Sequence, residues 1–236
     1  MLTLRSALRA SLLAAPLFLA AGSASAVLMT GSSGGSFSNV SQCNGSNNCR
    51  ITSAGGNGPN TQLEWGYAGN NPGSTLTAVD RSFSQSTTAN DMILAELVWV
   101  NRATPAGVTP NTFLANYTLA ISFTSPNAAS DTEVFNLQIT NPTNVTGDNI
   151  NGLTLLDLSN LSFALNGVIM SDLKYKVGDS SSTFISNVWY NPEENQGRMF
   201  ITADFTERVA VPEPASLGLL GAGLLGIGVM RQRRKA

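Results

Sequence analysis

Carboxylates are the side chains in this sequence with the best means of doing chemistry, because its 236 residues include no histidine. That absence removes the Ser-His-Asp and Cys-His catalytic sets and most zinc sites. Three carboxylate pairs lie close in the sequence: Asp91 with Glu96, Asp131 with Glu133, and Glu193 with Glu194. Unpaired carboxylates are mostly solvated, so we expect surface positions for all three pairs and a protein that is not an enzyme. A glycosidase stays open as an alternative, since its two acids can come from distant strands.

One stretch of oxygen-bearing side chains suggests a cation. The sequence "TGDNING" places Asp148, Asn149 and Asn151 between glycines. Carboxylate and amide oxygens in a loop suit calcium, although the spacing differs from that of an EF-hand. A plain turn explains the same residues. We expect no other cofactor.

Aromatic residues offer a third kind of site. Trp65, Trp99 and Trp189 each lie among apolar neighbours, which favours core packing over sugar stacking. In "NVWYNPEENQG", Trp189 and Tyr190 are adjacent on an expected strand and so point to opposite faces. One of the two is therefore exposed and is the candidate ligand-binding residue.

Alternating apolar residues predict the elements that would position these groups. Residues 113–123 have an apolar side chain at every second position, and 135–139 continue the pattern after a turn-like "SPNAASD", which predicts a hairpin. Further strands are expected within 61–67, 74–79, 91–100, 161–165, 171–178, 184–190 and 198–205. Asn166-Gly167 predicts a tight turn that folds 161–165 back on the next residues. About eight to ten antiparallel strands indicate an all-β domain, a β-sandwich or jelly roll.

Charge and cysteine content indicate where this domain works. Residues 27–210 hold seven basic residues against fourteen acids, a net charge near −7 that disfavours nucleic acid as a partner. The abundant Asn, Ser, Thr and Gly suit neutral polymers such as polysaccharide and suit any secreted β protein equally well. Cys43 and Cys49 are expected to form a disulfide, as in exported proteins.

The N-terminal 26 residues have the layout of a secretory signal peptide. Arg5 and Arg9 precede an apolar stretch, and Ala24-Ser25-Ala26 supplies the small residues of a cleavage site. Cleavage after Ala26 and passage through the Sec translocon are expected. Residues 27–210 then form the exported domain.

The C-terminal residues 211–236 combine three features. Pro212, Glu213 and Pro214 precede an uncharged run of 16 residues, 215–230, and a basic end with Arg231, Arg233 and Arg234. The run is close to the lower limit of about 17 residues for a membrane-spanning helix. The basic end would stay in the cytoplasm by the positive-inside rule. A single transmembrane helix is expected, either as a permanent anchor or as part of a recognised signal.

This order of features resembles the PEP-CTERM sorting signal of Gram-negative bacteria. The resemblance implies processing by an exosortase, with Pro212, Glu213 and Pro214 as recognised residues. It implies transient anchoring in the inner membrane, followed by delivery to the cell surface or the extracellular matrix, where such proteins are associated with exopolysaccharide and biofilm.

A second resemblance concerns residues 60–205. "LEWG" at 63–66, Ser74, Leu76 and "ILAELVWVN" ending at Asn101 are similar to the choice-of-anchor K or THxN-type domains of exosortase substrates. Val98 and Trp99 stand where that family has threonine and histidine, so only Asn101 of the motif agrees and the histidine's role has no counterpart. We expect a non-enzymatic surface or matrix protein; the alternative is a carbohydrate-binding module on the same export route.

Overall fold

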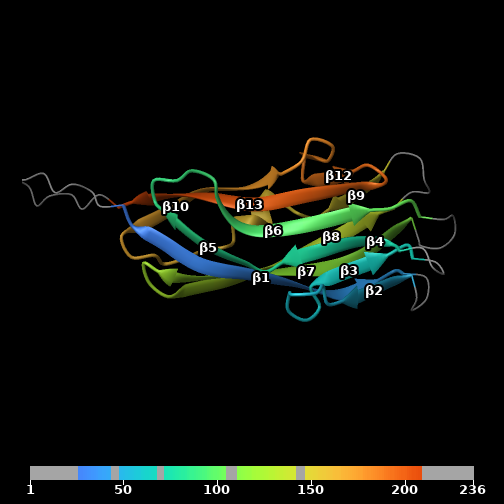
Figure 1. Cartoon of the computed structure of the whole chain (residues 1–236), viewed down its shortest axis with the longest axis horizontal. Helices are drawn as coiled ribbons and strands as arrows, with labels where there is room; N and C mark the ends of the chain where they lie inside the picture. Colours follow the sequence, from blue (N-terminus) through green and yellow to red (C-terminus); the bar gives the residue numbers. More distant parts are fainter. Residues whose placement is uncertain (1–25, 44–47, 68–71, 105–110, 142–146, 209–236) are drawn as a thin grey trace, which may run out of the picture.

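The computed structural model describes residues 26–43, 48–67, 72–104, 111–141 and 147–208, which form two antiparallel sheets packed as a sandwich (Figure 1). The prediction of an all-β sandwich is confirmed. Thirteen strands lie in these ranges, more than the eight to ten expected from the sequence.

The two sheets contain seven and six strands. The seven-stranded sheet has the order β11 (Thr183–Ile185), β12 (Val188–Asn191), β9 (Asp148–Asn151), β8 (Ala129–Thr140), β7 (Thr112–Ser125), β1 (Leu28–Ser41) and β5 (Arg81–Ser86). The six-stranded sheet has the order β10 (Val168–Val177), β13 (Asn195–Glu207), β6 (Met92–Asn101), β4 (Ser74–Val79), β3 (Gln62–Trp65) and β2 (Cys49–Thr52).

The hairpin predicted from the clearest alternation is present. β7 and β8 pair along their whole lengths, with Phe113 opposite Ile139 and Tyr117 opposite Phe135. All four side chains are at most 1% exposed, so the apolar positions face the other sheet as the alternation requires. The strand predicted at 74–79 coincides with β4.

β1 is the main strand that the sequence pattern did not indicate. Its residues are mostly Gly and Ser, yet it pairs with β5 on one side and β7 on the other. Aromatic rings explain the glycines: a Cβ on Gly31 would lie 2.5 Å from Cζ of Phe83, and one on Gly35 would lie 2.6 Å from Cε2 of Tyr117. Glycine at these two positions of β1 therefore leaves space for aromatic rings from β5 and β7.

Two predicted strands are corrected. The segment predicted as one strand at 184–190 is the hairpin of β11 and β12, because Ser186 and Asn187 both have positive φ, as a tight two-residue turn requires. Residues 161–165 are not a strand. They follow the single-turn helix α1 (Leu155–Leu158) and insert Leu161 and Leu165 into the core as a plug.

Polar groups hold this plug in place. Ser162 N donates to Asp131 Oδ2 (2.8 Å), and Asn166 N donates to Asn127 Oδ1 (2.7 Å). Backbone nitrogens that donate to these side chains are not available for pairing with a neighbouring strand, so this segment is not part of a sheet. The predicted turn at Asn166-Gly167 is present, and β10 begins directly after it.

Aromatic rings fill the space between the sheets. Trp99 of β6 lies 6.2 Å from Trp65 of β3 and 5.2 Å from Trp189 of β12, measured between ring centroids. Trp65 also lies 5.7 Å from Phe113 of β7. All three tryptophans are fully buried, which confirms the expectation of core packing.

Two smaller features complete the described chain. Cys43 and Cys49 form the expected disulfide, which joins the end of the β1 segment to the start of β2. Within the described ranges, no helix has the length and apolarity needed to span a membrane.

The glycine at position 31 provides a test of the packing. Gly31→Ala should lower the free energy of unfolding by about 1–3 kcal/mol, because its Cβ would clash with the carbonyl oxygen of Ser122 and the ring of Phe83. Gly55→Ala is the matched control, since a Cβ added there would meet no atom within 4 Å. Urea unfolding of both variants measures the difference; equal midpoints would contradict this account of β1.

Candidate functional site

The predicted signal peptide and sorting signal lie outside the described residues, apart from Ala26. This holds for Pro212, Glu213, Pro214 and the basic end with Arg231, Arg233 and Arg234. The structure instead describes the place where these segments join the domain.

We call this place the terminal junction, formed by Val27, Thr87, Gly167, Glu207 and Arg208. Val27 N donates to Thr87 Oγ1 (3.1 Å) and to Glu207 Oε1 (3.0 Å). Arg208 N donates to the carbonyl oxygen of Gly167 (2.8 Å). The first and last described strands therefore begin and end at the same end of the sandwich (Figure 1).

The linker between the domain and the Pro-Glu-Pro stretch is short. Only residues 209–211 separate Arg208 from Pro212. Consecutive Cα atoms are 3.80 Å apart, so four steps of extended chain span about 14 Å at most. The stretch therefore begins within about 14 Å of the terminal junction.

The opposite end of the sandwich contains buried polar side chains. Asn101 Nδ2 donates to the carbonyl oxygen of Asn191 (2.8 Å), and Asn191 Nδ2 donates to that of Trp99 (3.1 Å). Ser74 Oγ donates to Asn101 Oδ1 (3.2 Å). Asn101, the one position shared with the THxN pattern, thus joins β4, β6 and β12 and is fully buried.

Two carboxylates at this end have raised pKa values. Burial, followed by the charge of Glu193, raises the pKa of Asp148 to about 8, while the indole of Trp65 acts in the opposite direction. Burial and then the charge of Glu194 raise the pKa of Glu193. Both Glu193 carboxylate oxygens are buried without a hydrogen-bond partner. Asp148 is therefore largely protonated at neutral pH.

The predicted calcium loop is the strand β9. Asp148 faces the interior, whereas Asn149 and Asn151 lie on the outer face, where Asn151 Nδ2 donates to Asn149 Oδ1 (2.9 Å). Pairing with β8 and β12 fixes this alternation, so the prediction of a loop is wrong. The three side chains do not converge on one point.

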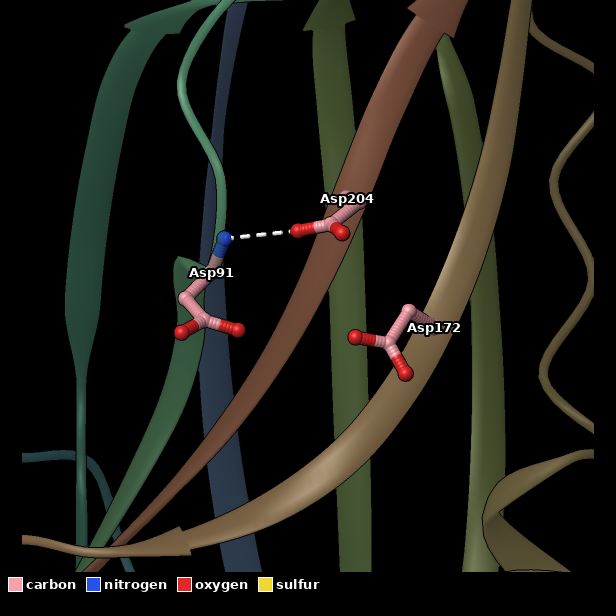
Figure 2. A group of neighbouring side chains, drawn as sticks. All are labelled: Asp91, Asp172 and Asp204. Carbon is pink, nitrogen blue, oxygen red and sulfur yellow. Dashed lines mark hydrogen bonds between the residues drawn. The ribbon is translucent and has the colours of Figure 1, made fainter.

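A different acidic group lies near the terminal junction: Asp91, Asp172 and Asp204, which Figure 2 shows. One carboxylate oxygen from each lies within 4.8 Å of the others, and Asp91 N donates to Asp204 Oδ1 (2.7 Å). No sequence pattern indicated this group, since its members are far apart in the chain.

Two lysines offset part of the negative charge of this acidic group. Lys174 Nζ lies 2.8 Å and Lys176 Nζ 3.0 Å from the Asp91 carboxylate, and Lys174 also pairs with Asp172. Hydrogen bonds from these two ammonium groups lower the pKa of Asp91. Two ammonium groups thus already occupy carboxylate oxygens of Asp91 and Asp172.

In the three carboxylate pairs found in the sequence, every member except Glu193 has a hydrogen-bond or ion-pair partner. Glu96 is 5% exposed between Arg81 and Arg198, so its expected surface position is wrong: the two arginines compensate its burial. Asp131 and Glu133 hold the plug segment, Glu133 through Asn160 Nδ2. Glu194 accepts a hydrogen bond from Ala103 N.

Trp189 and Tyr190, the adjacent aromatic residues, differ in exposure. Trp189 is fully buried and its Nε1 donates to Ser182 Oγ (3.2 Å), so its ring offers no surface for stacking. Tyr190 is partly exposed and is the remaining member of the candidate pair.

Comparison with known proteins identifies the tail. Residues 210–235 match the family model of the PEP-CTERM protein-sorting motif. No curated protein matches the chain. The PEP-CTERM motif implies an exported, membrane-processed protein of a Gram-negative bacterium and processing by an exosortase.

The face of the seven-stranded sheet that looks away from the core carries no charge among the described strand residues. These strands contain four charged residues, and each lies on the same side of its strand as the buried core residues: Arg81, Asp131, Glu133 and Asp148. The outer positions hold mostly hydroxyl, amide and small side chains, including Ser32, Ser122, Ser130 and Asn136, together with the exposed apolar side chains of Val134 and Ile185.

This uncharged face has a shallow hollow over β1, beside the middle of the strand. Its volume is about 290 Å³, and its lining includes Gly34, Ser36, Thr118, Ala120 and Asp80. Asp80 is the one charged lining residue: its Oδ1 would lie 2.9 Å from a Cβ added at Gly34, and its Oδ2 accepts a hydrogen bond from Gly58 N (2.9 Å). β13, the last described strand before the PEP-CTERM motif, ends at the terminal junction.

The raised pKa of Asp148 gives stability a pH dependence. The folded state holds this proton more tightly than the unfolded state, where an aspartate has a pKa of about 3.9, so its contribution is complete below pH 4 and is lost as pH rises toward 8. We expect the free energy of unfolding to fall by up to about 1.4 kcal/mol per pH unit between these values from this group. Asp148→Asn should remove that part of the fall.

Urea unfolding at pH 5 and pH 8 measures this effect. Asn149→Ala, a non-titrating change on the outer face of the same strand, should keep the wild-type fall. A fall that is the same in Asp148→Asn as in the wild type would show that another group is responsible.

Proposed function

We propose that the chain is a non-enzymatic protein of the cell surface or extracellular matrix, exported through the Sec translocon and released from the inner membrane by an exosortase. The PEP-CTERM motif is the observation that carries the proposal. Its tether of three residues, 209–211, would hold the domain close to the membrane by the terminal junction until processing.

The use of the charged side chains supports a protein without catalytic chemistry. Glu96, Asp131 and Glu133 are engaged by arginines or by the plug segment. In the acidic group, Asp91 is paired with two lysines. A glycosidase would need one free carboxylate and one protonated acid that both contact substrate across a cleft. Asp148 and Glu193 are the pair with raised pKa values, and Asp148 is fully buried.

We propose extracellular polysaccharide as the partner of this protein, with the uncharged face as the contact. A surface made mainly of uncharged hydroxyl and amide groups can exchange hydrogen bonds with a neutral sugar chain at little cost in ion desolvation. The hollow at Gly34 and Ala120 would admit a sugar ring close to the backbone. A more specific version of this proposal is a carbohydrate-binding module on the same export route. In that case Tyr190, which lies on the same face, would be the aromatic residue that contacts the sugar.

The intact mass of the protein from its native host tests the export proposal. We expect a chain that lacks residues 1–26 and the residues after about 214, because both signals are consumed. A mass that still includes residues 231–235 would indicate a permanent anchor and contradict exosortase processing.

Binding of the processed chain to polysaccharides from the same host tests the partner. Ala120→Lys places a charge in the hollow and should weaken binding at least about tenfold, roughly 1.4 kcal/mol, through lost fit and desolvation of the ammonium group. Thr206→Lys adds the same charge on an exposed position of the other sheet and should bind as the wild type does. Equal binding by the two variants would rule out the uncharged face.

A further inference from the structure

The backbone of Val27 is held at both of its polar groups. Its nitrogen donates to Thr87 Oγ1 (3.1 Å) and Glu207 Oε1 (3.0 Å), and its carbonyl oxygen accepts from Thr87 N (2.9 Å). Thr87 is 7% exposed, and its hydroxyl also contacts Glu207 Oε1 (3.3 Å). The Val27 side chain packs against the core.

The acceptors around the Val27 nitrogen exceed what a peptide group needs. A peptide nitrogen has one hydrogen to donate, yet a hydroxyl and a carboxylate both lie at hydrogen-bond distance from it. An ammonium group has three hydrogens and a positive charge, and its hydrogen bonds to a carboxylate are about twice as strong as neutral ones. The site is therefore better matched to a free amino terminus than to a continuing chain.

We propose that Thr87 and Glu207 form a binding site for the α-ammonium group of Val27 that signal-peptide removal creates. The inference rests on the proposed export and on cleavage after Ala26. Hydrolysis of the Ala26–Val27 peptide bond adds the hydroxyl of water to the Ala26 carbonyl carbon and the remaining hydrogen to the Val27 nitrogen. That nitrogen takes one further proton from solvent at neutral pH, since an α-amino group has a pKa of about 8.

Capture of this group joins the two sheets. Val27 precedes β1 of the seven-stranded sheet, Thr87 follows β5 of the same sheet, and Glu207 ends β13 of the six-stranded sheet. The ion pair thus links the first residue of the processed chain to the last strand before the PEP-CTERM motif. Processing at the N-terminus would strengthen the terminal junction from which the motif extends.

Selective acetylation of the amino terminus tests the proposal on the processed chain recovered from exporting cells. Near pH 6.5 an α-amino group reacts before lysine, whose pKa is about 10.4. Acetylation returns the Val27 nitrogen to a neutral amide and should lower the melting temperature by about 1–4 °C. In the Glu207→Gln variant, acetylation should produce no such shift, because the carboxylate is gone.

Glu133→Gln is the matched control, since Glu133 is also a partly exposed strand carboxylate but bonds to Asn160. It should keep the full acetylation shift. Mass spectrometry of the untreated sample separates the two ways to fail. An amino terminus other than Val27 would overturn the cleavage position and the capture together, whereas a Val27 terminus with no acetylation shift would overturn the capture alone. The wild-type comparison decides this even if Glu207→Gln does not fold.

Discussion

Burial of aromatic rings between two sheets is the constraint on which the other features depend. Packed sheets lie about 10 Å apart, and the three tryptophans fill that gap from both sides. Once these rings are fixed, the parity of every neighbouring strand is fixed as well, because a shift by one residue would turn the apolar set outward. The glycines of β1 and the plug at Leu161 and Leu165 are adjustments to the same packing: one makes room for rings, and the other closes the side of the core.

That packing also determines where charge can go. Charged residues of the seven-stranded sheet lie on the side of each strand that faces the core, so each needs a partner. Asp131 accepts a hydrogen bond from the plug segment, and Arg81 pairs with Glu96. The six-stranded sheet instead carries ion pairs on its outer surface, such as Arg50 with Glu64. Carboxylates that fasten segments together are poor catalysts, because a catalytic acid or base must be free to contact substrate. These engaged carboxylates therefore support the proposed non-enzymatic role.

Sequence alone was sufficient where the determining contacts are local. The β7–β8 hairpin, the turn at Asn166-Gly167 and the disulfide depend on residues a few positions apart. Prediction from the sequence failed where the determining contacts come from distant residues. β1 is a strand because β5 and β7 pair with it on its two sides. Glu96 can be buried because it pairs with Arg198, which is 102 residues further along the chain. The sorting motif could be identified because its order of residue types is itself the signal, whereas the terminal junction depends on contacts between residues 180 positions apart.

The residues that form the folded domain and the residues that processing would remove are different. Cleavage after Ala26 and cleavage near the PEP-CTERM motif would both remove residues that lie outside all thirteen described strands. The sandwich can therefore keep the same hydrogen-bond ladders before and after each cut. Among the described residues, those nearest to both cuts form the terminal junction, where Val27 N contacts Glu207 Oε1. The proposed processing would therefore leave the thirteen described strands and the aromatic core between them in place.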